Sequence, residues 1–266
     1  MKKMFFFDID GTLIDCKNGI DYIPETTINS LNKLKENGDM VFLSTGRCKC
    51  FILDDVISYP FDGIVSCNGA YVEYKGKEVY KKVIDSKAIK LTHDLAKKYN
   101  WLYYFENSDK IYALDKEDKK HINFRDNWKM KPETIYDDFD FKNVETYIGM
   151  VVLNNESEIE ILQETLSPYF YIQRHQHGLS FDLTIKGESK GQGIRKMIEY
   201  LGLDMKDTIA FGDGRNDLEM LESVHLGIAM GNAASETKEV SDYITVDVQH
   251  DGITYALKEF SFIKND

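Results

Sequence analysis

Apolar runs of strand length alternate with helical segments near the start of the chain. Residues 4–8 (MFFFD) are an apolar run that ends in a carboxylate, and residues 40–44 and 63–67 are similar runs. Between the first two, residues 26–37 place apolar side chains at helical spacing as far as Gly38, a residue that commonly ends helices. Uniformly apolar runs of this length are typical of strands that are buried on both faces of a parallel sheet. This part of the chain therefore predicts an α/β arrangement, with a further helix over about 48–57.

The pattern changes at about residue 70. Residues 70–83 alternate and turn at Lys75-Gly76, which predicts a β-hairpin. Beyond it the pattern predicts helices at 86–99, 116–128 and 156–166 and strands at 101–105, 110–114, 147–153, 169–174 and 179–185. Mixed runs of this kind are typical of an α+β domain.

The first pattern returns after Gly187. It predicts helices at 190–201, 217–223 and 233–240, a last helix near the C-terminus, and strands at 207–211, 226–230 and 243–246. We therefore expect one α/β core domain with a Rossmann-like parallel sheet, made of residues 1–81 and 187–266. An α+β domain, residues 82–186, is inserted in it. In open parallel sheets the chemistry lies beyond the carboxyl ends of the strands.

Two carboxylates stand at the end of the first strand. Asp8 ends the apolar run, Asp10 lies two residues on, and Gly11 permits a sharp exit from the strand. A spacing of two directs both carboxylates to the same side, where they repel each other unless a cation or a shared proton intervenes. Mg²⁺ suits such a pair because it prefers oxygen ligands. Taken alone, the pattern is equally compatible with a simple turn.

A second strand end has matching chemistry. Residues 208–217 read TIAFGDGRND, so Asp213 follows an apolar strand, and Asn216 and Asp217 come after a glycine-rich turn. If the two strands lie side by side, three or four carboxylates converge there with one amide. Two strand ends of the same kind are much harder to ascribe to turns, and they favour a metal site.

Neutralising groups for a phosphate follow other predicted strands. Ser44-Thr45-Gly46-Arg47 comes after the second strand, where hydroxyls and backbone N–H groups can hold phosphoryl oxygens. Lys190 opens the helix that follows the insertion, and a lysine there can offset the carboxylates. Each signal is weak by itself, because such residues are common at helix starts and on helix surfaces. Together with the carboxylates they predict a site for an anionic substrate.

Composition and charge limit the classes of partner that this protein can have. The chain has 266 residues and a net charge of −12, with no dense basic run, which excludes a nucleic-acid partner. No apolar run approaches the length of a membrane span, and Asp8 interrupts the short apolar stretch near the N-terminus that imitates a signal peptide. We therefore expect a cytoplasmic protein without a membrane partner, either a monomer or a homodimer.

The four cysteines allow few interpretations. Cys16, Cys48, Cys50 and Cys67 are an improbable disulfide framework in a chain of this length without a secretion signal. Cys48 and Cys50 have the spacing of half a metal site, but no second pair at ligand spacing completes it. In the insertion, residues 174–178 (RHQHG) offer contacts for sugar hydroxyls or an anion, although a polar loop between two strands is the favoured interpretation.

The order of these segments resembles the haloacid dehalogenase-like superfamily. DIDGTL (8–13), STGR (44–47), Lys190 in ESKGQG and GDGRND (212–217) are similar to its four motifs. The closer resemblance is to the Cof-type phosphatases, which carry a large α+β cap between the second and third motifs. SCNGA (66–70) is similar to their run just before the cap. The resemblance spans the whole chain and is most specific for the first and fourth motifs.

The resemblance implies a phosphatase that forms an aspartyl-phosphate. Asp8 would be the nucleophile and a magnesium ligand. Asp10 would be the general acid–base and would ligate magnesium through its backbone carbonyl. Thr45 and Gly46 would bind the transferring phosphoryl group, and Lys190 would stabilise it.

The remaining matches complete the implied site. Asp213 would be a direct magnesium ligand, while Asn216 and Asp217 would orient the phosphate, the lysine or the metal's water ligands. Arg47 would help to bind the phosphate, and Asn68 would face the substrate pocket. The implied substrates are small phosphorylated metabolites, above all sugar phosphates, and the insertion is expected to cover the site and choose among them.

Three alternatives remain open from the sequence. A phosphomutase or phosphotransferase of the same superfamily would share every motif. A response-regulator receiver also phosphorylates an aspartate on a parallel sheet, but receivers are far shorter and use a middle strand. A non-catalytic phosphate-binding module would not need all four motifs intact.

Overall fold

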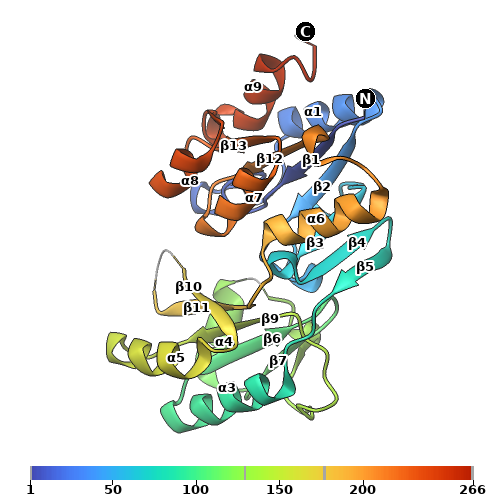
Figure 1. Ribbon diagram of the computed structural model, residues 1–266. Coiled ribbons are helices and arrows are strands. Elements are labelled where there is room, and N and C mark those ends of the chain that lie inside the picture. The colour runs from blue at the N-terminus through green and yellow to red at the C-terminus, as the bar shows by residue number, and fades with distance from the viewer. Residues whose placement is uncertain (1, 129, 176–177, 265–266) are drawn as a thin grey trace. The chain divides into compact units, whose positions relative to one another are not determined.

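The computed structural model describes residues 2–128, 130–175 and 178–264 and divides into two compact units (Figure 1). The first unit contains the described residues up to Gly46, the segment Ile52–Tyr80, and the described residues from Ser189 onward. The second contains Lys81–Glu188 together with a short segment, Arg47–Phe51. The chain therefore enters the second unit twice, first for the five residues Arg47–Phe51 and then for the long segment Lys81–Glu188.

An eight-stranded sheet forms the middle of the first unit, in the order β14-β13-β12-β1-β2-β3-β4-β5. Its strands are β1 Met4–Phe7, β2 Met40–Ser44, β3 Gly63–Ser66, β4 Tyr71–Tyr74, β5 Lys77–Lys81, β12 Thr208–Gly212, β13 Leu226–Ala229 and β14 Tyr243–Ile244. The six strands from β14 to β3 are parallel, and β4 runs antiparallel to β3. The predicted parallel sheet is confirmed, and so is the hairpin, whose turn residues Lys75 and Gly76 both have positive φ.

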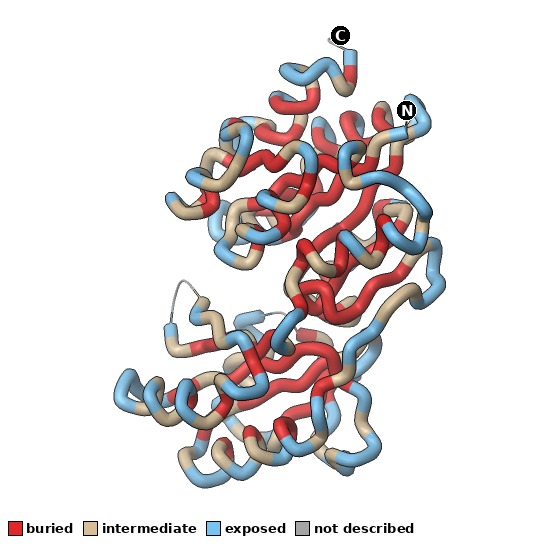
Figure 2. Tube along the Cα trace, viewed as in Figure 1, coloured by how far each residue is buried: buried red, intermediate tan, exposed pale blue. Residues whose placement is uncertain are grey.

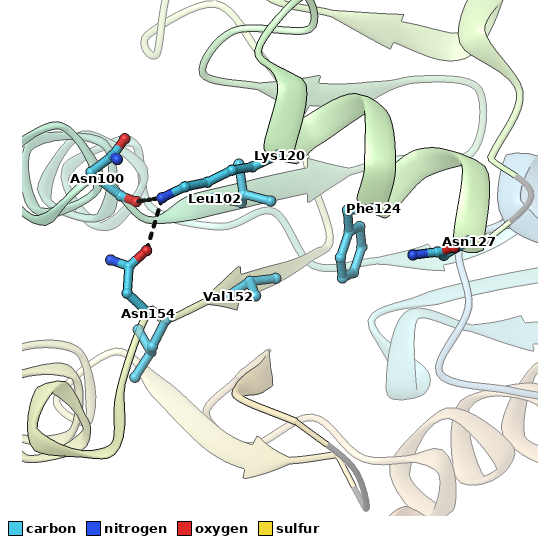
Figure 3. A pocket seen from close by; sticks show the side chains of 8 residues that line it. Asn100, Leu102, Lys120, Phe124, Asn127, Val152 and Asn154 are labelled. Carbon is cyan, nitrogen blue, oxygen red and sulfur yellow. Dashed lines mark hydrogen bonds between the residues drawn. The ribbon is translucent and has the colours of Figure 1, made fainter.

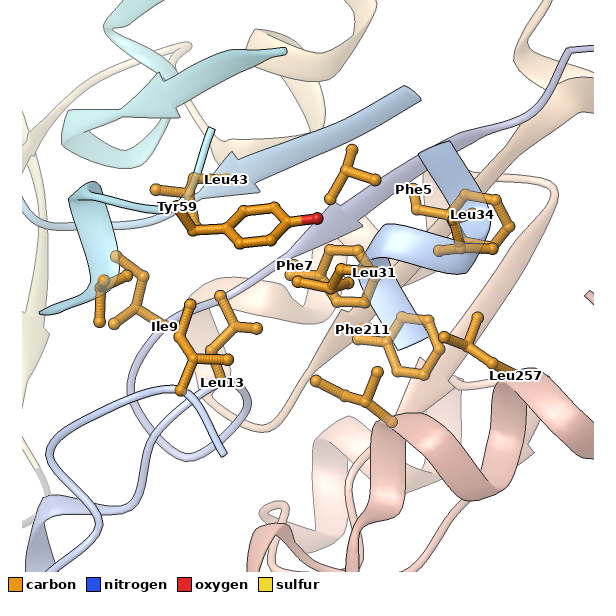
Figure 4. Close-up of a cluster of buried hydrophobic side chains, with 14 of the residues drawn as sticks. Phe5, Phe7, Ile9, Leu13, Leu31, Leu34, Leu43, Tyr59, Phe211 and Leu257 are labelled. Atoms are coloured by element: carbon orange, nitrogen blue, oxygen red, sulfur yellow. The ribbon is translucent and has the colours of Figure 1, made fainter. Parts of the chain in front are cut away.

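Helices cover both faces of this sheet, so its central strands are buried throughout (Figure 2). The helices of the first unit are α1 Glu25–Glu36, α2 Asp54–Ile57, α6 Lys190–Leu201, α7 Leu218–Ser223, α8 Ser235–Val240 and α9 Gly252–Glu259. Phe5 and Phe7 pack with residues of α1 and α9 on one face (Figure 4). Phe6 points the other way, into a cluster with α6 and α7. Each buried Phe contributes roughly 1.5–3 kcal/mol, which fixes β1 firmly in the sheet.

The strand order reverses at β1. β2 lies on one side of β1, and β12, which comes much later in the chain, lies on the other. In sheets of this kind, ligands bind beyond the carboxyl ends of the two strands at such a reversal. The residues that follow Phe7 and Gly212 are therefore the place to look for a site.

A six-stranded mixed sheet forms the second unit, in the order β10-β11-β9-β6-β7-β8. Its strands are β6 Leu102–Glu106, β7 Ile111–Ala113, β8 Ile135–Tyr136, β9 Ile148–Val152, β10 Phe170–Arg174 and β11 Ser180–Ile185, and its helices are α3 Ser86–Tyr99, α4 Lys119–Asn127 and α5 Ile159–Leu166. Side chains of α3 and α5 share one apolar cluster with Tyr103 and Phe105 of β6. Tyr104 points to the opposite face, where it packs near Phe124 of α4. The predicted α+β architecture of the insertion is confirmed.

The predicted helix over 48–57 is wrong. The segment contains a 3₁₀ turn, Lys49–Phe51, and then α2, and Leu53 between them has an extended backbone with ψ of 142°. The cause is tertiary, because Arg47–Phe51 packs with the second unit whereas Ile52 and the residues after it pack with the first. One continuous helix would not serve both units.

Two further differences are small. The two-residue strand β8 was not predicted, because so short a segment carries no alternation. α4 begins at Lys119 rather than 116, because the Asp118 side chain accepts a hydrogen bond from the Lys120 N–H and caps the helix there. Across the described ranges, none of the helices has both the length and the apolar character needed to cross a membrane.

Candidate active site

Three buried carboxylates meet at the carboxyl ends of β1 and β12. Asp8 directly follows β1 and Asp213 directly follows β12, and the two strands pair in parallel with Phe7 opposite Phe211. The Asp8 N–H donates to the Phe211 carbonyl over 3.0 Å. One carboxylate oxygen from each of Asp8, Asp213 and Asp217 lies within 4.8 Å of the others. The structure thus brings together the aspartates that the sequence placed at two separate strand ends.

Lys190 is fully buried between two of these aspartates. Its Nζ donates to Asp8 Oδ1 and to Asp217 Oδ1, both over 2.6 Å. The lysine is placed by the first turn of α6, whose N-terminus is capped by the Ser189 hydroxyl, which accepts from the Gln192 N–H. Burial by itself lowers the pKa of the Lys190 ammonium, but Asp217 and Asp8 outweigh burial and raise that pKa above its ordinary value. The amine is therefore held as a cation.

Asp217 organises the turn after β12. Its Oδ2 accepts hydrogen bonds from the N–H groups of Asp213 and Gly214, over 3.0 and 2.9 Å. Gly212 leaves room for it, since a Cβ at that position would lie 2.6 Å from the Asp217 carboxyl carbon. With Lys190 on Oδ1 and two amides on Oδ2, both oxygens of Asp217 already have donors. Asp8 and Asp213 are therefore better placed than Asp217 to bind a cation directly.

The pKa values of Asp8 and Asp213 reflect an excess of negative charge. Burial raises the pKa of Asp8 to about 7, with further contributions from Asp217 and Asp10, while Lys190 acts in the opposite direction. Burial, followed by Asp8 and Asp217, raises the pKa of Asp213 to about 9. One ammonium does not balance three carboxylates, so a bound cation would stabilise their ionised forms.

The donors and the space fit a hard divalent cation. All three side chains offer carboxylate oxygens, the ligands that Mg²⁺ prefers. Gly11 keeps the approach to Asp213 clear, because a Cβ on Gly11 would lie 2.2 Å from Asp213 Oδ2. Gly11 also has a φ of +84°, which other residues rarely adopt. The Thr12 hydroxyl lies 3.5 Å from Asp213 Oδ1 and helps to fix that carboxylate.

A second group of predicted residues gathers where the loops after β2, β3 and β12 meet. Asn216 Nδ2 donates to Asn68 Oδ1 over 3.1 Å, and the Asn68 N–H donates to the Thr45 carbonyl over 3.2 Å. A Cβ on Gly46 would lie 3.0 Å from Asn68 Oδ1 and 3.3 Å from Asn216 Nδ2. Asn68 has a φ of 50°, a strained conformation that such contacts over-determine. These four residues therefore form one polar group within the first unit.

Two predicted site residues, Asp10 and Arg47, belong neither to the buried carboxylate cluster nor to this polar group. Asp10 is exposed, although Asp8 two residues earlier is buried. Arg47 belongs to the second unit, where its Nη1 donates to the Phe51 carbonyl over 2.9 Å and its guanidinium lies 4.9 Å from the Phe51 ring centre. The Arg47 side chain is thus oriented by its own short segment.

The structure also shows a residue near the site that the sequence analysis did not identify. Asn232 Nδ2 donates to the Gly11 carbonyl over 2.8 Å and holds the loop after β1 in place. Asn232 follows β13, which is parallel to β12. The rule about carboxyl ends of strands points to this position, but a single asparagine after one glycine gives little signal.

A pocket of about 250 Å³ lies within the second unit (Figure 3). It is lined by Asn100, Leu102, Lys120, Phe124, Asn127, Val152, Leu153 and Asn154. The Lys120 amine donates to Asn154 Oδ1 over 2.9 Å and lies 3.4 Å from the Asn100 carbonyl. None of the motif residues lines this pocket, so it is separate from the carboxylate cluster.

The predicted RHQHG segment of the insertion is only partly described. Gln176 and His177 lie outside the described residues. Arg174 pairs with Glu156 and donates to the Gly178 carbonyl, and His175 Nε2 lies 2.8 Å from Asp182. Arg174 and His175 therefore take part in polar contacts within the second unit, which agrees with a polar loop.

Comparison with known proteins now identifies the family. A family model described as haloacid dehalogenase-like hydrolase matches residues 5–257. The chain belongs to this family. The predicted family resemblance is confirmed, and the second unit is the cap that members of its subclass IIB carry.

Individual relatives match the whole length of the chain. YkrA of Bacillus subtilis (strain 168), which carries a provisional name as a phosphatase, is 34% identical over 263 residues, covering 98% of this chain and 99% of YkrA. A crystal structure of a hypothetical protein from Geobacillus kaustophilus HTA426 superposes with a TM-score of 0.87 at 34% identity, covering 99% of this chain and 100% of the other. The subclass IIB sugar phosphatase BT4131 superposes with a TM-score of 0.84 at 30% identity, covering 98% and 100%.

Proposed function

We propose that this chain, a phosphatase of the haloacid dehalogenase-like family, is a Mg²⁺-dependent enzyme that hydrolyses small phosphorylated metabolites through an aspartyl-phosphate on Asp8. The observation that carries the proposal is the buried arrangement of Lys190 with Asp8 and Asp217, next to Asp213, where the strand order reverses. A structural ion pair would need one carboxylate for one lysine. Three carboxylates in this place instead provide for a cation and a phosphoryl group.

Asp8 acts as the nucleophile. A carboxylate is a weak nucleophile, so it depends on groups that draw charge from the phosphorus. Bound to Asp8 and Asp213, Mg²⁺ would supply Lewis-acid neutralisation of the phosphoryl oxygens. Lys190, held 2.6 Å from Asp8, fixes the carboxylate and places a positive charge beside the incoming phosphoryl group. Asp8 attacks in line, and the bond from phosphorus to the leaving oxygen breaks as the aspartyl-phosphate forms.

Asp10 acts first as the general acid and then as the general base. It donates one to the leaving alkoxide in the first step and then accepts one from the water that hydrolyses the aspartyl-phosphate. Its exposure, in contrast to the burial of Asp8, agrees with a group that exchanges protons with substrate and water. Thr45 and Gly46 bind the phosphoryl oxygens, and Asn216, held by Asn68, orients them. Arg47 adds a cation for the phosphate.

Sugar phosphates are the substrate class that we propose. BT4131, which matches 98% of this chain, is named a sugar phosphatase. A charge of −12 disfavours polyanions, whereas a single phosphate group can be neutralised by Mg²⁺ and Lys190. The cap, residues 82–186, would cover the site and select the sugar, and a core domain of residues 1–81 and 187–266 would perform the chemistry.

The test is a substrate screen with one decisive variant. The purified protein is assayed for phosphate release from an aryl phosphate and a panel of sugar phosphates, with Mg²⁺ or with a chelator. We expect turnover only with Mg²⁺ and a loss of at least about 10³-fold in Asp8→Asn, which keeps the size of the side chain but not its nucleophilicity. Retained turnover in a folded Asp8→Asn variant would exclude the mechanism. Isomerised sugar phosphate without phosphate release would point to a phosphomutase.

A further inference from the structure

The second unit contains a pair of thiols that phosphoryl transfer does not use. The sulfur atoms of Cys48 and Cys50 lie 3.2 Å apart. Both belong to the Arg47–Phe51 segment, which follows directly after the proposed phosphate-binding Thr45 and Gly46. None of the four cysteines is in a disulfide. A disulfide bond of about 2 Å needs these two sulfurs to approach by just over 1 Å.

A metal site is not the explanation for this pair. Among the described residues, the cluster of Asp8, Asp213 and Asp217 is the one group with three suitably close metal-binding side chains. Cys48 and Cys50 have no third ligand of that kind at metal-binding distance within the described ranges. The structure therefore gives no support to the interpretation of the pair as half of a zinc site.

The surroundings of the two sulfurs differ. Cys48 is completely buried, whereas Cys50 is partly exposed and its thiol donates to the Asn107 carbonyl over 3.6 Å. The buried carboxyl group of Glu106, next to Asn107 at the end of β6, accepts hydrogen bonds from the backbone N–H and the thiol of Cys48. One cysteine is thus partly exposed, and the thiol of the other is bonded to a carboxyl group.

The Glu106 carboxyl is suited to exchange a proton near neutral pH. Burial raises the pKa of Glu106 to about 7, and Asp182 adds to the rise, while the hydrogen bonds from Cys48 and the charge of Arg47 lower it. Because the Cys48 thiol already donates to Glu106, transfer of its proton to the carboxylate needs no rearrangement. This matters because the thiolate is the nucleophile in thiol chemistry.

We propose that Cys48 and Cys50 form a peroxide-reactive dithiol, in which the partly exposed Cys50 is oxidised first and the buried Cys48 converts it to a disulfide. The Cys50 sulfur attacks one oxygen of the peroxide and the O–O bond breaks, which gives a sulfenic acid and one water. The Cys48 sulfur then attacks the Cys50 sulfur, an S–S bond forms and the S–O bond breaks. Glu106 takes the Cys48 proton and returns it to the departing hydroxide. Two thiols and one hydrogen peroxide give one disulfide and two waters.

Disulfide formation changes the segment after the phosphate-binding residues. It removes the thiol proton that Cys48 shares with Glu106 and the one that Cys50 shares with the Asn107 carbonyl. Arg47 stands between Gly46 and Cys48, so we expect oxidation to lower phosphatase turnover. This consequence rests on the proposed function, whereas the disulfide itself does not.

The experiment treats the full-length protein with hydrogen peroxide and measures intact mass and turnover together. We expect the mass to fall by about 2 Da, the value for loss of two hydrogens. Tandem mass spectrometry of peptides should assign the link to Cys48 and Cys50. Turnover should fall at least about fivefold and return after a dithiol reductant. Cys16→Ser, which removes an exposed thiol elsewhere in the chain, is the matched control and should behave as the wild type.

Three variants separate the steps. Cys48→Ser should stop at a sulfenic acid on Cys50 that dimedone traps, and Cys50→Ser should form no disulfide. Glu106→Gln should form the sulfenic acid at the normal rate but close the disulfide roughly tenfold more slowly. No 2-Da loss, or a link through Cys16 or Cys67, would overturn the proposal. A disulfide with unchanged turnover would overturn its effect on activity alone, and the mass result stands even if the proposed phosphatase assignment fails.

Discussion

Both units bury carboxyl groups beside the ends of sheet strands, but different groups stabilise these carboxyls in the two units. The core places Asp8, Asp213 and Asp217 around the ammonium of Lys190. The cap places Glu106 against a thiol and a backbone N–H, with Arg47 as a charged neighbour. Burial raises the pKa of Asp8 and of Glu106 to about 7 alike.

The two sites therefore differ in the groups that contact the carboxyls rather than in how deeply the carboxyls are buried. A buried cation and a surplus of carboxylates prepare the core for a metal and a phosphoryl group. A neutral donor leaves the cap carboxyl able to gain and lose a proton, which suits thiol chemistry. Removal of the cation, the metal ligand, the space beside Asp213 and the ionisable group, one at a time, tests this contrast.

Removal of the buried cation should have the largest effect. In Lys190→Met, Asp8 and Asp217 lose their shared donor, and a broken buried ion pair costs about 3–5 kcal/mol. Turnover should fall at least about 10³-fold, because positive charge beside the phosphoryl group is lost. Urea unfolding and phosphate release measure the two effects.

The same helix offers the control. Lys196 lies in α6 as well, but it is partly exposed and pairs with Glu199 at 3.7 Å. Lys196→Met should cost under about 0.5 kcal/mol and leave turnover unchanged. Equal losses in the Lys190 and Lys196 variants would show that the core cluster has no special dependence on its cation.

Removal of the metal ligand should abolish the response to Mg²⁺. At 100 times its dissociation constant a ligand stabilises the folded state by about 2.7 kcal/mol, which raises the Tm of a chain of this size by roughly 5–10 °C. In Asp213→Asn the difference in Tm between Mg²⁺ and a chelator should disappear. Thermal melting followed by fluorescence measures it, and an undiminished shift would contradict the assignment of Asp213.

Filling the space beside Asp213 should damage activity more than stability. Gly11→Ala places a Cβ 2.2 Å from Asp213 Oδ2, so the carboxylate must move and turnover should fall at least about 100-fold. Gly38→Ala is the matched control, because Gly38 has a φ of +87° but nothing within 4 Å of its Cβ position. Both should lose about 1 kcal/mol to backbone strain. Similar turnover in the two variants would contradict the steric argument.

Neutralising the cap carboxyl should have the smallest effect, and it should depend on pH. The folded-state pKa of Glu106 is raised from 4.5 to about 7, so its contribution to stability is complete below pH 4.5 and is lost as the pH rises through 7. Glu106→Gln mimics the protonated form. Its stability relative to the wild type should therefore increase from pH 5 to pH 8, by on the order of 2 kcal/mol.

Urea unfolding at the two pH values measures this difference. Glu164→Gln, a substitution on the surface of the same unit, is the control against which it is read. A difference that does not change with pH would show that Glu106 keeps one protonation state over this range, and the proton exchange that we assign to the cap carboxyl would then fail.

Much of the core site could be predicted from the sequence. MFFFD and IAFGD are apolar runs that end in carboxylates, and runs of this kind are buried strands whose ends share one edge of a sheet. The sequence therefore predicted that Asp8 and Asp213, which are 205 residues apart in the chain, lie close together. Lys190 gave only a positional signal, since a lysine at a helix start is ordinarily solvated.

The rest depended on contacts between distant segments. The helix expected over 48–57 is broken because its two halves pack in different units. Glu106 lies just beyond the strand predicted at 101–105 and drew no prediction, and only its bonds to Cys48, 58 residues earlier, show its surroundings. Asn232 gave little signal in the sequence, and its role became clear only from its hydrogen bond to the Gly11 carbonyl.

The sequence by itself determined the α/β core, the inserted α+β cap and the chemical types at the strand ends. The local pattern of apolar and polar residues is enough to predict these features, because an apolar run of strand length is stable only when a packed layer buries it. Only the tertiary structure decided which carboxylates share a lysine, which one faces a thiol, and that Arg47–Phe51 belongs to the cap unit. Those outcomes depend on pairing and charge across long separations in the chain, and no local pattern encodes the distance between two such groups.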